Sequence, residues 1–172
     1  MRGTSALAMV FVFVAGLGTG MMAAKAKASP DLYRGKEAKA AGMALLQLAE
    51  AQAGSGSWER IGVGRVYYLS GDKARGQAIF DDVAKKAERS DWERIAKVYA
   101  EAGEWEKAAP ILRKINADKE DDSGLAFAGA LFNLNGDRAT AEEFFDRSFK
   151  SKPDEVWNTL SAAGSYLGVQ PN

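Results

Sequence analysis

The chain has 172 residues and contains neither histidine nor cysteine. These two absences exclude a Ser-His-Asp triad, a cysteine nucleophile, a disulfide and any zinc site built from Cys or His side chains. Basic and acidic residues both number 23, so the formal net charge is zero and gives no electrostatic reason to expect nucleic-acid binding.

The first 28 residues contain no acidic side chain and have the order of a secretory signal peptide. A positive start at Arg2 precedes the apolar run at residues 6–15, and a tract of small residues follows. We expect cleavage at the end of this tract, after Ala28, or alternatively after Ala24 or Ala26. The other interpretation is a retained anchor, because residues 6–24 are uncharged and barely long enough to cross a bilayer.

Cleavage would place the mature chain outside the cytoplasm. Without residues 1–28 it keeps 20 basic residues against 23 acidic ones, which makes it mildly acidic. Such a chain enters an oxidising compartment with no thiol to pair, so its stability must come from packing. We therefore expect an exported protein, in a bacterial periplasm or secreted, with an inner-membrane anchored protein as the alternative.

Residues 29–56 predict an N-terminal capping helix followed by a loop. Ser29 is a suitable N-cap and Pro30 a suitable first residue, so the helix is expected over 30–53. The Gly/Ser run at 54–57 then ends it. Apolar residues spaced by three and four continue through residues 57–172, which predicts further helices and no strands.

Three Gly-acid turns divide residues 57–172 into repeats: Gly71-Asp72, Gly103-Glu104 and Gly136-Asp137. The successive glycines lie 32 and 33 residues apart, a period typical of helical repeat arrays. Ser90 and Glu93 predict a capping box for the helix that precedes the second turn. The predicted helix pairs are 57–69 with 73–88, 90–102 with 105–116, and 123–134 with 138–150, followed by a capping helix at 154–167.

Residues at fixed distances from the turn glycines alternate between small and large. Small residues lie seven before and five after each glycine: Gly64, Ala96, Gly129, Gly76, Ala108 and Ala141. Large residues lie four before and nine after: Tyr67, Tyr99, Phe132, Phe80, Leu112 and Phe145. Ala163 and Tyr166 take the corresponding places in the last helix. This alternation is what two closely packed helices need, because a small residue admits the neighbouring backbone and a ring fills the space beside it.

In this order the residues resemble the tetratricopeptide repeat (TPR) family over about residues 57–168. The family's closing proline is matched at Pro153 and its early tryptophan at Trp92. The resemblance implies an all-α fold, a right-handed α-α superhelix of about three helical-hairpin repeats plus capping helices. It also implies a concave groove that holds peptides.

One helix face carries candidate groove residues. Trp58, Ile61, Arg65 and Tyr68 are spaced by three, four and three residues and therefore share a face, opposite the stripe that contains Tyr67. Carried over by position from the family, the candidates for binding a peptide or protein are Arg65, Tyr68, Glu93, Lys97, Asn133 and Trp157. The other interpretation is that these side chains pack against the helix at 30–53 or against neighbouring turns.

The candidate groove would be apolar at its ends and charged in its middle. One subclass of the family grips a C-terminal carboxylate with Lys, Asn and Arg side chains. That set is not reproduced here, since the matching positions hold Ile61, Arg65, Arg94 and Ala126.

These observations predict an exported, non-enzymatic scaffold or adaptor that binds a protein or peptide and needs no cofactor or metal. The acids at 118–122 lack the alternate spacing of a calcium loop, and the adjacent acids at 81–82 and 142–143 point about 100° apart on a helix. The alternatives are a membrane-tethered structural module that retains its N-terminal segment and, less favoured, a carboxylate-dependent hydrolase.

The mass of the protein isolated from its native compartment tests the fate of the N-terminal segment. We expect a chain that begins at Ser29, because the small-residue tract offers a cleavage site there. An intact Met1 would instead support the tethered module.

Overall fold

The computed structural model describes residues 27–118 and 123–171, so nearly all of the predicted signal peptide and most of the acidic cluster at 118–122 lie outside the described residues. Within these ranges the ordered elements are all helices. They are a 3-10 helix at Pro30–Leu32, α1 (Ala38–Ala53), α2 (Ser57–Leu69), α3 (Lys73–Ala84), α4 (Arg89–Glu101), α5 (Trp105–Asn116), α6 (Ser123–Leu134), α7 (Arg138–Ser151) and α8 (Val156–Tyr166). None of the described helices is long and apolar enough to cross a membrane.

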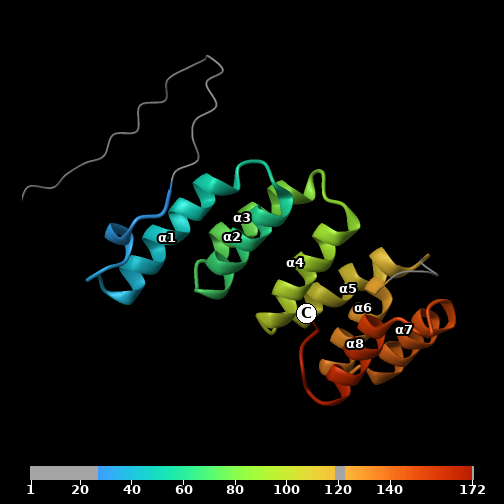
Figure 1. Cartoon of the computed structure of the whole chain (residues 1–172). Helices are drawn as coiled ribbons and strands as arrows, with labels where there is room; N and C mark the ends of the chain where they lie inside the picture. The colour runs from blue at the N-terminus through green and yellow to red at the C-terminus, as the bar shows by residue number, and fades with distance from the viewer. Residues whose placement is uncertain (1–26, 119–122, 172) are drawn as a thin grey trace, which may run out of the picture.

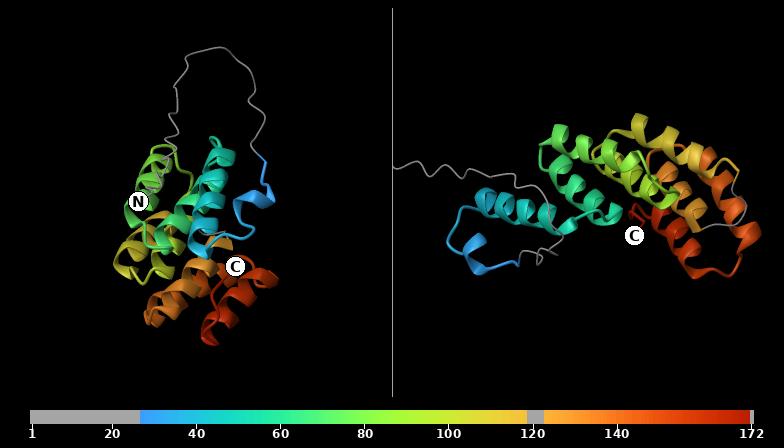
Figure 2. Two further views of the ribbon diagram at one scale, coloured as in Figure 1. Left: turned by 90° about the vertical axis from the view of Figure 1, so that its left-hand side faces the viewer. Right: turned by 90° about the horizontal axis from the view of Figure 1, so that it is seen from above.

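The helices form three hairpins with a single helix at each end. α2 packs on α3, α4 on α5, and α6 on α7, while α1 lies against α2 and α8 against α6 (Figures 1 and 2). Contacts between α2 and α4 and between α4 and α6 join successive hairpins. The predicted all-α fold of packed helix pairs is confirmed, and the right-handed superhelix stays a prediction.

The three turns of the repeat use glycine for the same reason. Gly71, Gly103 and Gly136 have φ values of 110°, 73° and 85°, a left-handed region that side chains disfavour. After the first and third glycines, the carboxylates of Asp72 and Asp137 cap the next helix by accepting from backbone N–H groups. Each Gly-acid pair therefore ends one helix, and two of the three also cap the next.

Small residues let the two helices of each hairpin approach closely. A Cβ placed on Gly76 in α3 would lie 2.7 Å from the carbonyl oxygen of Gly64 in α2. A Cβ on Gly129 would lie 2.7 Å from a ring carbon of Phe145. The second hairpin accommodates alanine, and Ala108 in α5 is completely buried. The predicted alternation of small and large residues is confirmed in the core.

Two neighbouring tyrosines are buried on different sides of α2. Tyr67 faces α1, where its hydroxyl donates to Glu50 over 3.0 Å. Tyr68 faces the second hairpin, and its ring packs against Phe80 and Tyr99 with centroid separations of 5.7 and 5.6 Å. Because α2 lies between α1 and α4, two of its faces are buried instead of one.

Several predicted helix limits are wrong. The helix expected over 30–53 is interrupted at Gly35, whose φ is 71°, and Ser29 makes no side-chain capping hydrogen bond. The helix expected over 73–88 ends at Ala84. The capping box of α4 is formed by Glu88 and Asp91, not by Ser90 and Glu93, so α4 begins one residue earlier than predicted.

The predicted register of the last helix is also wrong. α8 buries Asn158, Ala162 and Ser165, whereas Ala163 is exposed and Tyr166 is 48% exposed. Consecutive helical residues point about 100° apart, so α8 is rotated by about one residue from the pattern of the earlier hairpins. α8 packs chiefly on α6, and no described helix follows it to form a hairpin that would bury Tyr166.

Glu104 ties the first two hairpins together. Its carboxylate accepts a hydrogen bond of 2.5 Å from the Tyr68 hydroxyl and pairs with Lys107 at 2.6 Å and with Lys73. Lys107, Lys73 and Tyr68 together lower the pKa of Glu104 from its ordinary 4.5 to about 2. The acid of the second Gly-acid turn is thus used for a contact between hairpins and not for a cap.

Glu104→Gln is expected to lower the free energy of unfolding at pH 7 by about 1–3 kcal/mol, because it removes a charged acceptor with three partners. Since the folded pKa is depressed, the ionised carboxylate stabilises the fold above pH 4.5, and this contribution is lost as the pH falls toward 2. Urea unfolding followed by circular dichroism should therefore show a smaller difference at pH 3 than at pH 7. Glu106→Gln, which changes an exposed acid in the first turn of α5, is the control. An equal difference at both pH values would contradict the ionic role.

Candidate functional site

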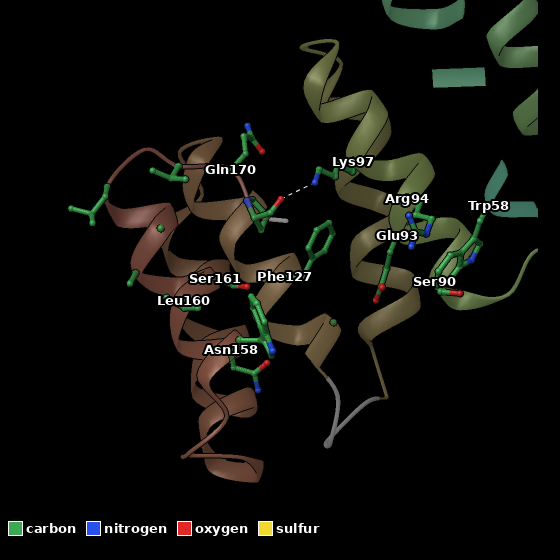
Figure 3. Close-up of a pocket in the computed structure, with 17 residues that line it drawn as sticks. Trp58, Ser90, Glu93, Arg94, Lys97, Phe127, Asn158, Leu160, Ser161 and Gln170 are labelled. Carbon is green, nitrogen blue, oxygen red and sulfur yellow. Dashed lines mark hydrogen bonds between the residues drawn. The ribbon is translucent and has the colours of Figure 1, made fainter. Parts of the chain in front are cut away.

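A groove of about 750 Å³ lies between α4 and α8, with α6 at its floor. Helices α2, α4, α6 and α8 all contribute to its lining, as does the segment at 167–171 (Figure 3). We call it the α4–α8 groove. The lining residues used below are Trp58, Glu93, Arg94, Lys97, Phe127, Trp157, Asn158, Leu160, Val169 and Pro171.

One wall carries positive charge beside an aromatic ring. The guanidinium of Arg94 lies over the exposed ring of Trp58, with 3.7 Å between its central carbon and the ring centroid. Such stacking fixes both side chains and leaves the guanidinium N–H groups for other acceptors. One turn further along α4, the ammonium of Lys97 lies 5.9 Å from the ring centroid of Phe127. Figure 3 shows Arg94 and Trp58 across the groove from Asn158 and Leu160, with Phe127 between the two walls.

Glu93 lies on the same wall and is largely buried. Burial raises the pKa of its carboxyl group, and the cations of Arg89 and Arg94 oppose that rise. Its Oε1 atom lies 3.1 Å from Arg89 Nη2. A Cβ on Gly124 would come within 2.2 Å of the same oxygen, so glycine at the start of α6 makes room for the Arg89–Glu93 pair. With Glu93 paired, Arg94 and Lys97 give the groove an excess of positive charge.

The opposite wall is formed by α8 and is largely apolar. Trp157 is 63% exposed and Leu160 is 53% exposed, which is unusual for side chains of this size. Between them in the sequence, Asn158 is only 1% exposed. Neither its amide nitrogen nor its amide oxygen has a hydrogen-bond partner among the described residues. A buried amide without partners is costly, and it calls for an explanation.

The segment that follows α8 folds back into the groove. Gly168 has a φ of 77° and turns the chain, and the Val169 N–H donates to the Gly164 carbonyl over 2.8 Å. Pro171 is buried, and its carbonyl oxygen accepts a 2.7 Å hydrogen bond from Lys97 Nζ (Figure 3). This contact joins residues 74 positions apart in the sequence.

Of the six predicted site residues, the structure brings three together in the groove. Glu93 and Lys97 lie on one wall and Trp157 on the other. Arg65 lies outside the lining, where its Nε atom pairs with Glu101 Oε2 at 2.7 Å. Asn133 is held between α6 and α8 by a 3.0 Å hydrogen bond to the Ser165 hydroxyl.

The structure contradicts the prediction that Tyr68 lines the groove. Its side chain is 2% exposed and belongs to the core between the first two hairpins, not to a groove surface. A place in the groove requires one face of α2 to be open, whereas α1 and α4 cover two of its faces. Ile61, from the same predicted face, is 3% exposed for the same reason.

Sequence reasoning missed four features of the groove: the roles of Arg94, Phe127 and Asn158, and the return of the segment at 167–171. In the sequence, Arg94 stands out only as one of the positions that match the carboxylate-gripping set of the family. A signal for the returning segment exists in the sequence, because Gly168 follows the last helix as a C-terminal glycine does and an apolar residue comes next. Asn158 gives no such signal, since its burial depends on the rotation of α8.

The carboxylates considered for hydrolysis lie on the surface. Asp82 is paired with Arg60 at 2.6 Å and with Lys85 at 2.8 Å, and Glu142 is paired with Arg138 at 2.7 Å. Among the described residues, no group of three or more acidic side chains is placed to hold a metal ion. The groove lining contains aromatic, cationic and amide groups together with the largely buried carboxyl group of Glu93.

The TPR resemblance is supported by the residue pattern of this chain and not by any match to a known protein. No protein-family model matches it, and comparisons with curated proteins and with solved structures give no match.

Proposed function

We propose that this protein is an exported, non-enzymatic scaffold or adaptor of the TPR type that binds a segment of another protein in the α4–α8 groove. The observation that carries the proposal is the pair of exposed tryptophans on opposite walls, Trp58 and Trp157, with Arg94 stacked on the first. Tryptophan and arginine are the residue types that most often dominate protein recognition. Large apolar side chains that remain exposed around a concave surface mark a site where a partner can bury them.

The compartment is part of the proposal. The signal-like residues 1–28 support export to a bacterial periplasm or secretion, and the absence of cysteine suits an oxidising environment. The alternative of a tethered module keeps the same groove but presents it at the membrane.

Capture of partners by paired variants tests the groove. The double variant Arg94→Ala/Trp157→Ala should reduce the amount of captured partner at least about tenfold, because both side chains of a recognition cluster are lost. The matched control is Arg138→Ala/Val156→Ala, since Arg138 stacks on the exposed ring of Tyr166 in the same way but lies outside the groove.

The measurement is crosslinked pull-down from the exported fraction with quantitative mass spectrometry, and circular dichroism checks that helicity is unchanged. The proposal requires a set of proteins that the unaltered chain and the control capture and the groove variant loses. Equal capture by all three proteins would exclude the groove as the binding site.

Asn158→Leu separates a role in binding from a role in packing. Replacing a buried, unpartnered amide by an apolar side chain of similar size should raise the free energy of unfolding by about 1 kcal/mol. If Asn158 hydrogen-bonds the partner, the same variant should nevertheless capture less of it. Urea unfolding and the pull-down measure the two effects, and unchanged capture would assign Asn158 to helix packing alone.

A further inference from the structure

We propose that the α4–α8 groove takes an extended, proline-containing peptide segment, and that residues 168–171 of this chain hold its place until such a segment displaces them. This inference rests on the proposed function and names the class of ligand. Its starting point is the seating of Pro171: the proline is buried in the groove, whereas Leu167 is 80% exposed and Val169 is 58% exposed.

The contact that holds the segment is made to the backbone. Lys97 Nζ donates to the carbonyl oxygen of Pro171, and every peptide presents such an oxygen. The same lysine lies over the ring of Phe127, which lines the groove next to it. Proline-containing segments are well suited to aromatic-lined grooves, because they are extended before they bind and lose little conformational entropy. The groove thus combines a surface for an apolar ring with a donor for a main-chain carbonyl.

The segment of this chain leaves part of the groove unused. The amide of Asn158 keeps both its nitrogen and its oxygen without partners while residues 168–171 are in place. Arg94 likewise contacts Trp58 but no residue of the segment at 168–171 in any described interaction. A longer ligand could also contact the Arg94 guanidinium, so it can bind more tightly than the segment it replaces.

Tethering makes residues 168–171 a competitor. A segment joined to its site by a short linker has an effective concentration in the millimolar range, although it is held by few contacts. The apparent affinity for an external peptide equals the intrinsic affinity multiplied by the fraction of molecules whose groove is open. Weakening the tethered segment should therefore strengthen binding of an external copy.

The experiment uses the full chain and two matched double variants. In the first, Val169→Ser/Pro171→Ser weakens the segment in the groove. In the control, Val156→Ser/Pro153→Ser makes the same chemical changes outside the groove, and Val156 is 57% exposed against 58% for Val169. The probe is the synthetic peptide Ac-Leu-Gly-Val-Gln-Pro-NH2, which copies residues 167–171, with a scrambled peptide beside it. Isothermal titration calorimetry and tryptophan fluorescence measure binding.

We expect the segment variant to bind the probe at least tenfold more tightly than the unaltered chain or the control, and the scrambled peptide to bind more weakly. Equal affinities in the three proteins, or no binding to the segment variant, would overturn the inference. A dimer that forms with the unaltered chain and disappears in the segment variant would also overturn it, because the segment would then be exchanged between copies.

The two proposals can fail separately. If the probe does not bind but the Arg94/Trp157 variant loses its partners, the groove binds proteins without this competition. If the probe binds as expected but capture is unaffected by that variant, the groove serves only its own segment and the proposed function is wrong.

Discussion

The close approach of the two helices in each hairpin is the constraint on which the other features depend. At Gly64 and Gly76 the backbones are near enough that one added Cβ would meet a carbonyl oxygen at 2.7 Å. Large rings such as Phe80 fill the space that the small residues leave beside them. Because the two helices of a hairpin lie close together, successive hairpins can stack on one another. The first helices of the three hairpins, α2, α4 and α6, then contribute to the same groove. The α4 wall of the groove is placed by this stacking.

The contact between the first and second hairpins is polar at its edge and aromatic at its centre. Tyr68 takes part in both, since its ring packs on Phe80 and Tyr99 and its hydroxyl reaches Glu104. This arrangement holds α4 relative to α2, and with it the stacking of Arg94 on Trp58. The groove is therefore supported by residues that do not line it.

Local sequence patterns predicted the features that depend on local physics. Glycine at positive φ and a carboxylate at a helix start act within a few residues, so the three turns could be placed before the structure was known. The small and large positions could be placed because the repeat supplies the same neighbours three times. The burial of Tyr68 could not be predicted in this way, because it depends on α1 and α4 covering two faces of α2. The rotation of α8 and the return of Pro171 could not be predicted either, because α8 is not part of a described hairpin and the repeat pattern therefore does not specify its packing.

The two walls of the groove differ in how many helices support them. α8 is the last of the described helices and packs chiefly on α6, whereas α4 contacts α2, α5 and α6. In repeat proteins each unit is stabilised by its neighbours, so a terminal helix opens at a lower free-energy cost than an internal one. The groove thus joins α4, which packs between α2 and α6, to α8, which packs chiefly on α6. A ligand that contacts both would bind molecules with α8 in place and would therefore disfavour local opening of this helix. Affinity and the local stability of α8 are for this reason thermodynamically linked.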